Sequence, residues 1–180
     1  MPAEAKKRKI EDEDHKFAEL KRVQPEYRSD EFQVVLHAGG KKLVQRLLKK
    51  WKEAPEAKVY MYVEEYVKFM VLKIRNAKFG YQSLVPPAII DAVWHEHIID
   101  TRSYQDDVND LAASLFGHND NIFIHHDPEG GEGTREEQLA RLKMCYASAG
   151  FVTSGYEGWS KHVWESKLSE IKWFAKPQVD

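Results

Sequence analysis

The sequence predicts a mainly α-helical protein: a single-domain, irregular helical bundle preceded by a charged tail. Apolar residues recur at helical spacing in several segments, and helix-start and helix-stop signals separate these segments. No series of alternating strands and no internal repeat interrupts the pattern. A chain of 180 residues of which 42% are hydrophobic is long and apolar enough to bury one core. The helical domain is expected to cover residues 29–180, and residues 1–28 form the tail.

The tail is polar and highly charged, which predicts disorder because such a segment buries too little apolar surface to offset its conformational entropy. Its basic run, Lys6, Lys7, Arg8 and Lys9, resembles a monopartite nuclear-import signal, and the alternative is a solvated charge run. Importin is therefore an expected partner, and the nucleus or the cytoplasm the expected location. The sequence contains neither the apolar centre of a secretory signal nor a run approaching the ~20 apolar residues of a membrane span. Secretion and a membrane partner are therefore not expected.

The overall charge argues against a strongly basic surface over the whole chain, since 27 basic and 29 acidic residues give a net charge of −2. Local basic segments at 6–9 and 49–52 leave nucleic-acid binding as an alternative that is not favoured. The chain contains one cysteine, Cys145, so no internal disulfide can form. No Gly-rich loop precedes a helix, and nucleotide binding by that route has no support.

Two helical segments are predicted before residue 80. The first begins at Ser29 or Asp30, is interrupted by the glycine pair at 39–40, and ends at Pro55. The second begins near Glu56, and apolar residues cover most of its circumference. A helix with this pattern is expected at the centre of the bundle.

A third helix is predicted to begin at the proline pair 86–87 and to continue past Tyr104 towards Leu115. A capping box of Thr134 and Glu137 starts a fourth helix. Apolar residues at helical spacing predict a final amphipathic helix over 159–174.

The third helix carries a crowded group of ionisable residues. Asp91 and His95 are four positions apart, so their side chains share one face and can bind the same metal ion. His97 lies about 200° around the helix from His95. It can join these two ligands only if the helix breaks at Glu96, and it is assigned instead as a catalytic acid or base. Trp94 is expected to pack beside the ligands and hold them in place.

A second group follows an apolar extended segment at 122–124. Adjacent side chains of an extended chain point to opposite sides, so one of His125 and His126 is expected to face the site. The favoured assignment makes His126 the metal ligand and His125 a catalytic acid or base. Asp127 supports the ligands, or it donates an oxygen ligand itself, as Glu129 also can.

A mixed set of imidazole and carboxylate ligands suits a divalent metal, with Fe(II) or Zn(II) favoured and Mn(II) also compatible. Open positions on the ion would let the protein act as a metal-dependent hydrolase or oxygenase. The main alternative is a nuclear protein-interaction module, with an unknown protein partner, whose histidines form a buried polar network that fixes helix packing. A nucleic-acid-binding accessory protein is the second alternative.

An ordered set of short motifs over about residues 60–160 resembles the glycine-rich domain-containing protein-like family. The motifs are EYVKFM at 65–70, VPP at 85–87, D-x-x-W-H-x-H at 91–97, FIHH at 123–126, and a later Trp159. The resemblance implies a mainly helical fold and gives weight to His95, His97 and His126, but it implies no substrate. The sequence contains no Gly-rich tail and no RNA-recognition module like those of longer plant members, so no RNA-related role follows from the resemblance.

Overall fold

The computed structural model confirms a mainly helical bundle. It describes residues 40–79, 84–117, 121–127, 130 and 133–149. Within these ranges lie five helices and no strand: α3 (Lys41–Lys50), α4 (Glu56–Phe79), α5 (Ala88–Ile98), α6 (Thr101–Phe116) and α7 (Arg135–Ser148). The expected tail, the helix start at Ser29 or Asp30 and the helix at 159–174 lie outside the described residues. None of the described helices has the length and apolar character that a bilayer crossing needs.

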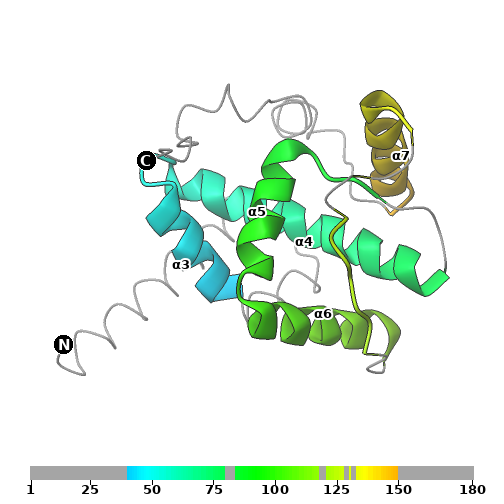
Figure 1. The fold of residues 1–180 in the computed structure, drawn as a ribbon, viewed down its shortest axis with the longest axis horizontal. Coiled ribbons are helices and arrows are strands. Elements are labelled where there is room, and N and C mark those ends of the chain that lie inside the picture. Colours follow the sequence, from blue (N-terminus) through cyan, green and yellow to red (C-terminus); the bar gives the residue numbers. More distant parts are fainter. Residues whose placement is uncertain (1–39, 80–83, 118–120, 128–129, 131–132, 150–180) are drawn as a thin grey trace.

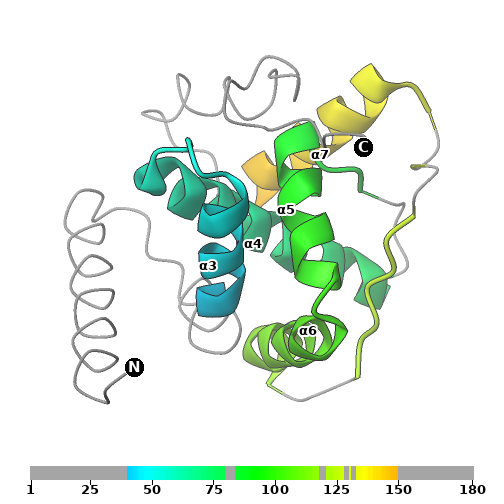
Figure 2. The ribbon, with the colours of Figure 1, turned by 60° about the vertical axis from the view of Figure 1, so that its left-hand side comes forward.

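Helix α4 is the centre of the bundle, as its apolar circumference predicted. It contacts α3, α5 and α6, and α5 crosses it while also contacting α3 and α6 (Figures 1 and 2). Large side chains along α4, among them Tyr62, Tyr66, Phe69 and Ile74, are almost completely buried. The removal of this apolar surface from water is the main force that holds the helices together.

The buried length of α4 also contains a paired charge. Lys68 is 3% exposed, and its ammonium lies 2.7 Å from Glu65 Oε1 and 3.1 Å from Glu64 Oε1. Burial by itself would lower the pKa of Lys68, but the carboxylates of Glu65 and Glu64 raise it above its usual value. The ammonium therefore stays charged, as a buried ion pair requires.

The predicted single helix beyond residues 86–87 is wrong, because the chain turns at Ile99 and Asp100 and forms α5 and α6 instead. Asp100 has non-helical backbone angles, and its carboxylate accepts a hydrogen bond of 3.3 Å from the Ser103 amide. This hydrogen bond lowers the pKa of Asp100, and the charge of Arg46 lowers it further. An N-cap aspartate of this kind satisfies a free amide of the first turn, which explains why a new helix begins here.

The basic segment at 49–52 is partly used in packing. The Lys50 ammonium forms an ion pair with the buried carboxylate of Glu96 on α5. Arg46 donates to the carbonyl oxygen of Glu96 and, over 3.2 Å, to Asp100 Oδ2. Trp51 at the end of α3 is 2% exposed. These contacts join α3 to α5, so part of the segment serves the fold.

Helix α7 begins as predicted. Thr134 Oγ1 accepts from the Glu137 amide over 3.3 Å, and Glu137 Oε2 accepts from the Thr134 amide over 2.7 Å, which completes the capping box. Gly133 precedes it with φ of 92°, and a Cβ there would lie 2.7 Å from Glu137 Oε2. At the other end of α7, the Tyr146 hydroxyl donates over 3.0 Å to the Glu65 carbonyl oxygen and fastens α7 to α4.

Candidate metal centre

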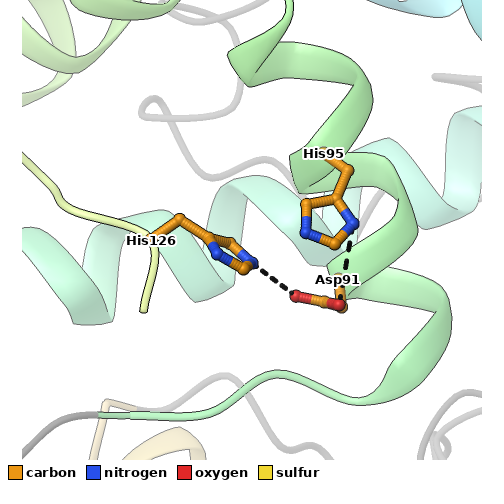
Figure 3. Close-up of side chains that lie close together, drawn as sticks. All are labelled: Asp91, His95 and His126. Carbon is orange, nitrogen blue, oxygen red and sulfur yellow. Dashed lines mark hydrogen bonds and ion pairs between the residues drawn. The ribbon is translucent and has the colours of Figure 1, made fainter. Parts of the chain in front are cut away.

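Three predicted metal ligands converge on one point: Asp91 and His95 from α5, and His126 from the extended segment at 121–127 (Figure 3). One donor atom from each residue lies within 4.8 Å of the other two. His126 Nε2 is 3.1 Å from Asp91 Oδ1, and His95 Nδ1 is 3.8 Å from Asp91 Oδ2. Residues 35 positions apart in the chain thus share one site.

The local geometry of α5 explains how Asp91 and His95 come to face the site. Asp91 and His95 lie one turn apart on the partly exposed face of the helix, whereas Ile89, Ile90 and Val93 are buried in the core. The apolar residues therefore set the rotation of α5 and turn the Asp91–His95 face towards the segment that carries His126. The i, i+4 spacing then places Asp91 and His95 next to each other on that face.

The position of His126 depends on Tyr104 of α6. The Tyr104 hydroxyl donates over 2.8 Å to the Ile124 carbonyl oxygen, and it accepts from Trp94 Nε1 over 3.1 Å. Burial raises the pKa of Tyr104 to about 12, so the phenol keeps the proton that it donates. Ile124 is itself buried and anchors the segment in the core. These contacts bring the next residues of the segment alongside α5.

Trp94, for which a supporting role was predicted, contacts the His126 ring directly. The two ring centroids are 4.6 Å apart, and the rings are tilted by 59°. The His126 ring also contacts the His95 ring, with centroids 4.5 Å apart. Trp94 is 2% exposed and belongs to the hydrophobic core, so the imidazole of His126 packs against a buried side chain.

The spacing of the three donor atoms is close to that of a metal site. Ligand atoms at 2.0–2.2 Å from one ion lie roughly 3–3.5 Å from each other in tetrahedral or octahedral geometry. The two separations from Asp91, 3.1 Å to His126 Nε2 and 3.8 Å to His95 Nδ1, lie near this range, and all three donor atoms lie within 4.8 Å of one another. The His95 side chain is 55% exposed and that of Asp91 is 35% exposed, so one side of the site is open. Two histidines and one carboxylate with open positions are typical of sites for Fe(II) and related divalent metals.

The site borders a cavity of about 390 Å³. Apolar groups of Leu84, Pro86 and Trp94 form part of its wall, and Lys73 and Arg135 contribute positive charge. Asp127 lines the same cavity, and its carboxylate counteracts the lowering of the Lys73 pKa that burial causes. Pockets of this size bind small molecules.

His97 lies away from this cluster, because α5 continues without a break through Glu96 to Ile98. Its imidazole is buried between α4 and α6: Nδ1 is 2.8 Å from the Tyr66 hydroxyl, and Nε2 is 2.8 Å from Asp107 Oδ2. Burial raises the pKa of Tyr66 well above its usual value, so the phenol keeps its proton. A carboxylate oxygen can only accept, so Nε2–H donates to Asp107, and in the neutral ring Nδ1 accepts from the Tyr66 hydroxyl. His97 was predicted to act in catalysis, and this position outside the cavity gives that role no support.

His125 also lies outside the cluster. Its side chain is exposed and stacks on Phe123, with ring centroids 6.3 Å apart. The structure therefore selects one histidine of the doublet, as the extended geometry predicted, and it selects His126. Glu129, the alternative oxygen ligand, lies outside the described residues.

The residues that sequence reasoning missed come from other helices. Lys73 belongs to α4, Arg135 to α7 and Tyr104 to α6. Tyr104 follows the Asp100 cap within one turn, and recognition of that cap would have placed it near the start of a helix. No local signal distinguishes Lys73 or Arg135 from other charged helix residues, because their approach to α5 depends on packing between distant segments.

The fold and the site together define a class: a helical-bundle protein with a His/Asp cluster that can hold a metal ion. Comparison with known proteins finds no matching family model, no matching curated protein and no matching solved structure. The resemblance to the glycine-rich domain-containing protein-like family therefore stays a prediction.

Replacement of Tyr104 by phenylalanine tests how the His126 segment is held. The change removes the hydrogen bonds to the Ile124 carbonyl oxygen and from Trp94 Nε1. We expect the free energy of unfolding to fall by about 1–3 kcal/mol, because two buried polar groups lose their partner. Urea denaturation measures this loss. A denaturation midpoint equal to that of the unmodified protein would show that Tyr104 does not anchor the segment.

Proposed function

We propose that Asp91, His95 and His126 bind a divalent metal ion, Fe(II) or Zn(II), and that the protein is a metal-dependent hydrolase or oxygenase. The observation that carries this proposal is the convergence of one carboxylate and two imidazoles, each donor within 4.8 Å of the others, at the edge of a cavity of about 390 Å³. Each ligand is of a type that such ions bind in proteins.

The chemistry follows from the open side of the site. A bound ion would supply the Lewis acidity that activates a water molecule. An iron ion would also supply an open position for dioxygen. The protein would contribute the fixed ligands and an apolar wall beside them. Trp94 keeps the His126 imidazole in place, and Lys73 and Arg135 lie where a substrate in the cavity would contact them.

Elemental analysis of the purified protein tests the proposal. Protein prepared anaerobically, or from metal-supplemented cultures, is expected to contain about one iron or zinc ion per chain, as a three-ligand site of this kind would hold. The His95→Ala variant should lose the metal and keep its helical circular dichroism spectrum, because His95 is half exposed and contributes little to the core. Metal-free protein from both preparations would contradict the proposal.

One observation favours a second candidate, a nuclear protein-interaction module with structural histidines. The buried contacts from Tyr66 through His97 to Asp107 are of the kind that fixes helix packing. In this alternative the Asp91, His95 and His126 group also serves packing, and His95→Ala would loosen the domain without any effect on metal content. Import through residues 6–9 by importin belongs to this candidate, and green fluorescent protein fused to the chain, with and without these residues, tests it.

A further inference from the structure

Two cations face the cavity beside the candidate metal centre. Lys73 lies on α4, with its ammonium 5.1 Å from the centroid of the Trp94 ring and 3.3 Å from the Leu84 carbonyl oxygen. Arg135 is the first residue of α7, and its Nη2 donates over 2.8 Å to the Pro86 carbonyl oxygen. Both side chains are thus held by backbone carbonyl groups at the cavity wall. A guanidinium has five N–H groups, so the bond to Pro86 leaves donors for a ligand.

The charge of the lining depends on whether the metal centre is loaded. Lys73 and Arg135 are matched by the carboxylates of Asp91 and Asp127, so the lining without an ion is close to neutral. A divalent ion on Asp91 and the two histidines would add two positive charges. A cavity with excess positive charge and low-dielectric walls attracts anions.

The remaining side chains of the cavity wall indicate the kind of molecule that would carry the anionic group. Leu84, Val85, Pro86, Ala88 and the Trp94 ring present apolar surface to the cavity. A bare inorganic anion would leave this surface without a partner. A small molecule with an apolar skeleton would cover it, and the volume of about 390 Å³ lies at the lower end of the range for small-molecule pockets.

We infer that the cavity binds a small organic anion: its carboxylate or phosphate group meets Arg135 and Lys73, and its apolar skeleton lies against Leu84, Pro86 and Trp94. This inference rests on the proposed function, because the excess positive charge comes from the bound metal ion. Arg135 is the more specific of the two cations, since a guanidinium can donate two parallel hydrogen bonds to a carboxylate or a phosphate.

Calorimetric titration tests the inference in two stages. Zinc binding to the full-length protein is measured first, for the unmodified chain and for Arg135→Gln, Arg135→Lys and Arg102→Gln. Benzoate, phenyl phosphate and the neutral benzamide are then titrated into each zinc-loaded protein. The three probes share one apolar ring, so they differ in the group that would meet Arg135. Arg102→Gln is the matched control, because Arg102 is an exposed arginine in the first turn of α6 and does not line the cavity.

We expect at least one of the two anions to bind about tenfold or more tightly than benzamide, and its identity shows which anionic group the site prefers. Arg135→Gln should weaken binding of that anion by about tenfold or more, because the positive charge and the two parallel hydrogen bonds of the guanidinium are lost. Arg135→Lys should give an intermediate affinity, and Arg102→Gln should change nothing.

The outcomes separate the two proposals. If neither zinc nor Fe(II), titrated anaerobically, binds the unmodified chain, the proposed function is overturned, and so is the metal-dependent anion site. If zinc binds but neither anion binds more tightly than benzamide, only the inference of an anion site is overturned. The same holds if Arg135→Gln leaves the affinity of both anions unchanged while the circular dichroism spectrum shows an intact fold.

Discussion

Replacement of His97 by alanine is expected to lower the free energy of unfolding by about 3–5 kcal/mol, the range for a change that leaves a buried charge without its partner. The His97 imidazole joins Tyr66 on α4 to Asp107 on α6, with both contacts at 2.8 Å. All three side chains are 5% exposed or less. Its loss leaves a buried carboxylate and a buried hydroxyl without this partner, and it opens a cavity that the packed helices fill only in part.

His95→Ala is the matched control for this change. The substitution is the same and lies two positions away on the same helix, but the His95 side chain is 55% exposed. We expect it to change the free energy of unfolding by less than about 1 kcal/mol, as is usual for exposed positions. Urea denaturation in the presence of a chelator measures both variants, so that metal binding does not add to stability. Equal midpoints for the two variants would show that His97 does not fix the packing of α5.

The second large effect is expected at the extended segment, where His126→Ala should weaken zinc or iron binding by at least about a hundredfold. Loss of a partner that only orients a ligand already costs roughly 10–100-fold in metal affinity, and loss of a ligand costs more. His126 Nε2 lies 3.1 Å from Asp91 Oδ1, and only 17% of its side chain is exposed. The imidazole is therefore placed to coordinate the same ion as Asp91.

His125→Ala provides the control for this comparison. His125 precedes His126 directly, but its side chain is exposed and stacks on Phe123. Its replacement is expected to leave the metal affinity within about twofold of the unmodified protein, because it removes no donor atom from the cluster. Competition with a chromophoric chelator gives both dissociation constants. A similar loss in the two variants would mean that the doublet acts through the backbone of the segment, and it would remove His126 from the ligand set.

The same variants also distinguish the metal-centre proposal from the interaction-module alternative. The metal-centre proposal expects His95→Ala and His126→Ala to lose metal while they stay folded. The interaction-module alternative expects the same variants to lose stability instead. His97 has a structural position in either case, because its contacts with Tyr66 and Asp107 do not involve the cavity.

The sequence by itself determined the features that depend on neighbouring residues. The helical class and the central place of α4 follow from apolar spacing, and the start of α7 follows from the Thr134 and Glu137 capping box. The shared face of Asp91 and His95 follows from the i, i+4 rule, and the opposite directions of His125 and His126 follow from extended geometry. Each of these features is set by the backbone dihedral angles of a few consecutive residues.

Only the tertiary structure decided which distant residues meet. His126 reaches Asp91 because Tyr104 binds the Ile124 carbonyl oxygen, a contact across 20 residues. The break between α5 and α6 depends on the local cap at Asp100, and the contact of that residue with Arg46 reaches back to α3. His97 obtained partners on two other helices. Such contacts depend on how the whole apolar face of one helix packs against that of another. The residue pattern within a single segment does not say which faces will meet.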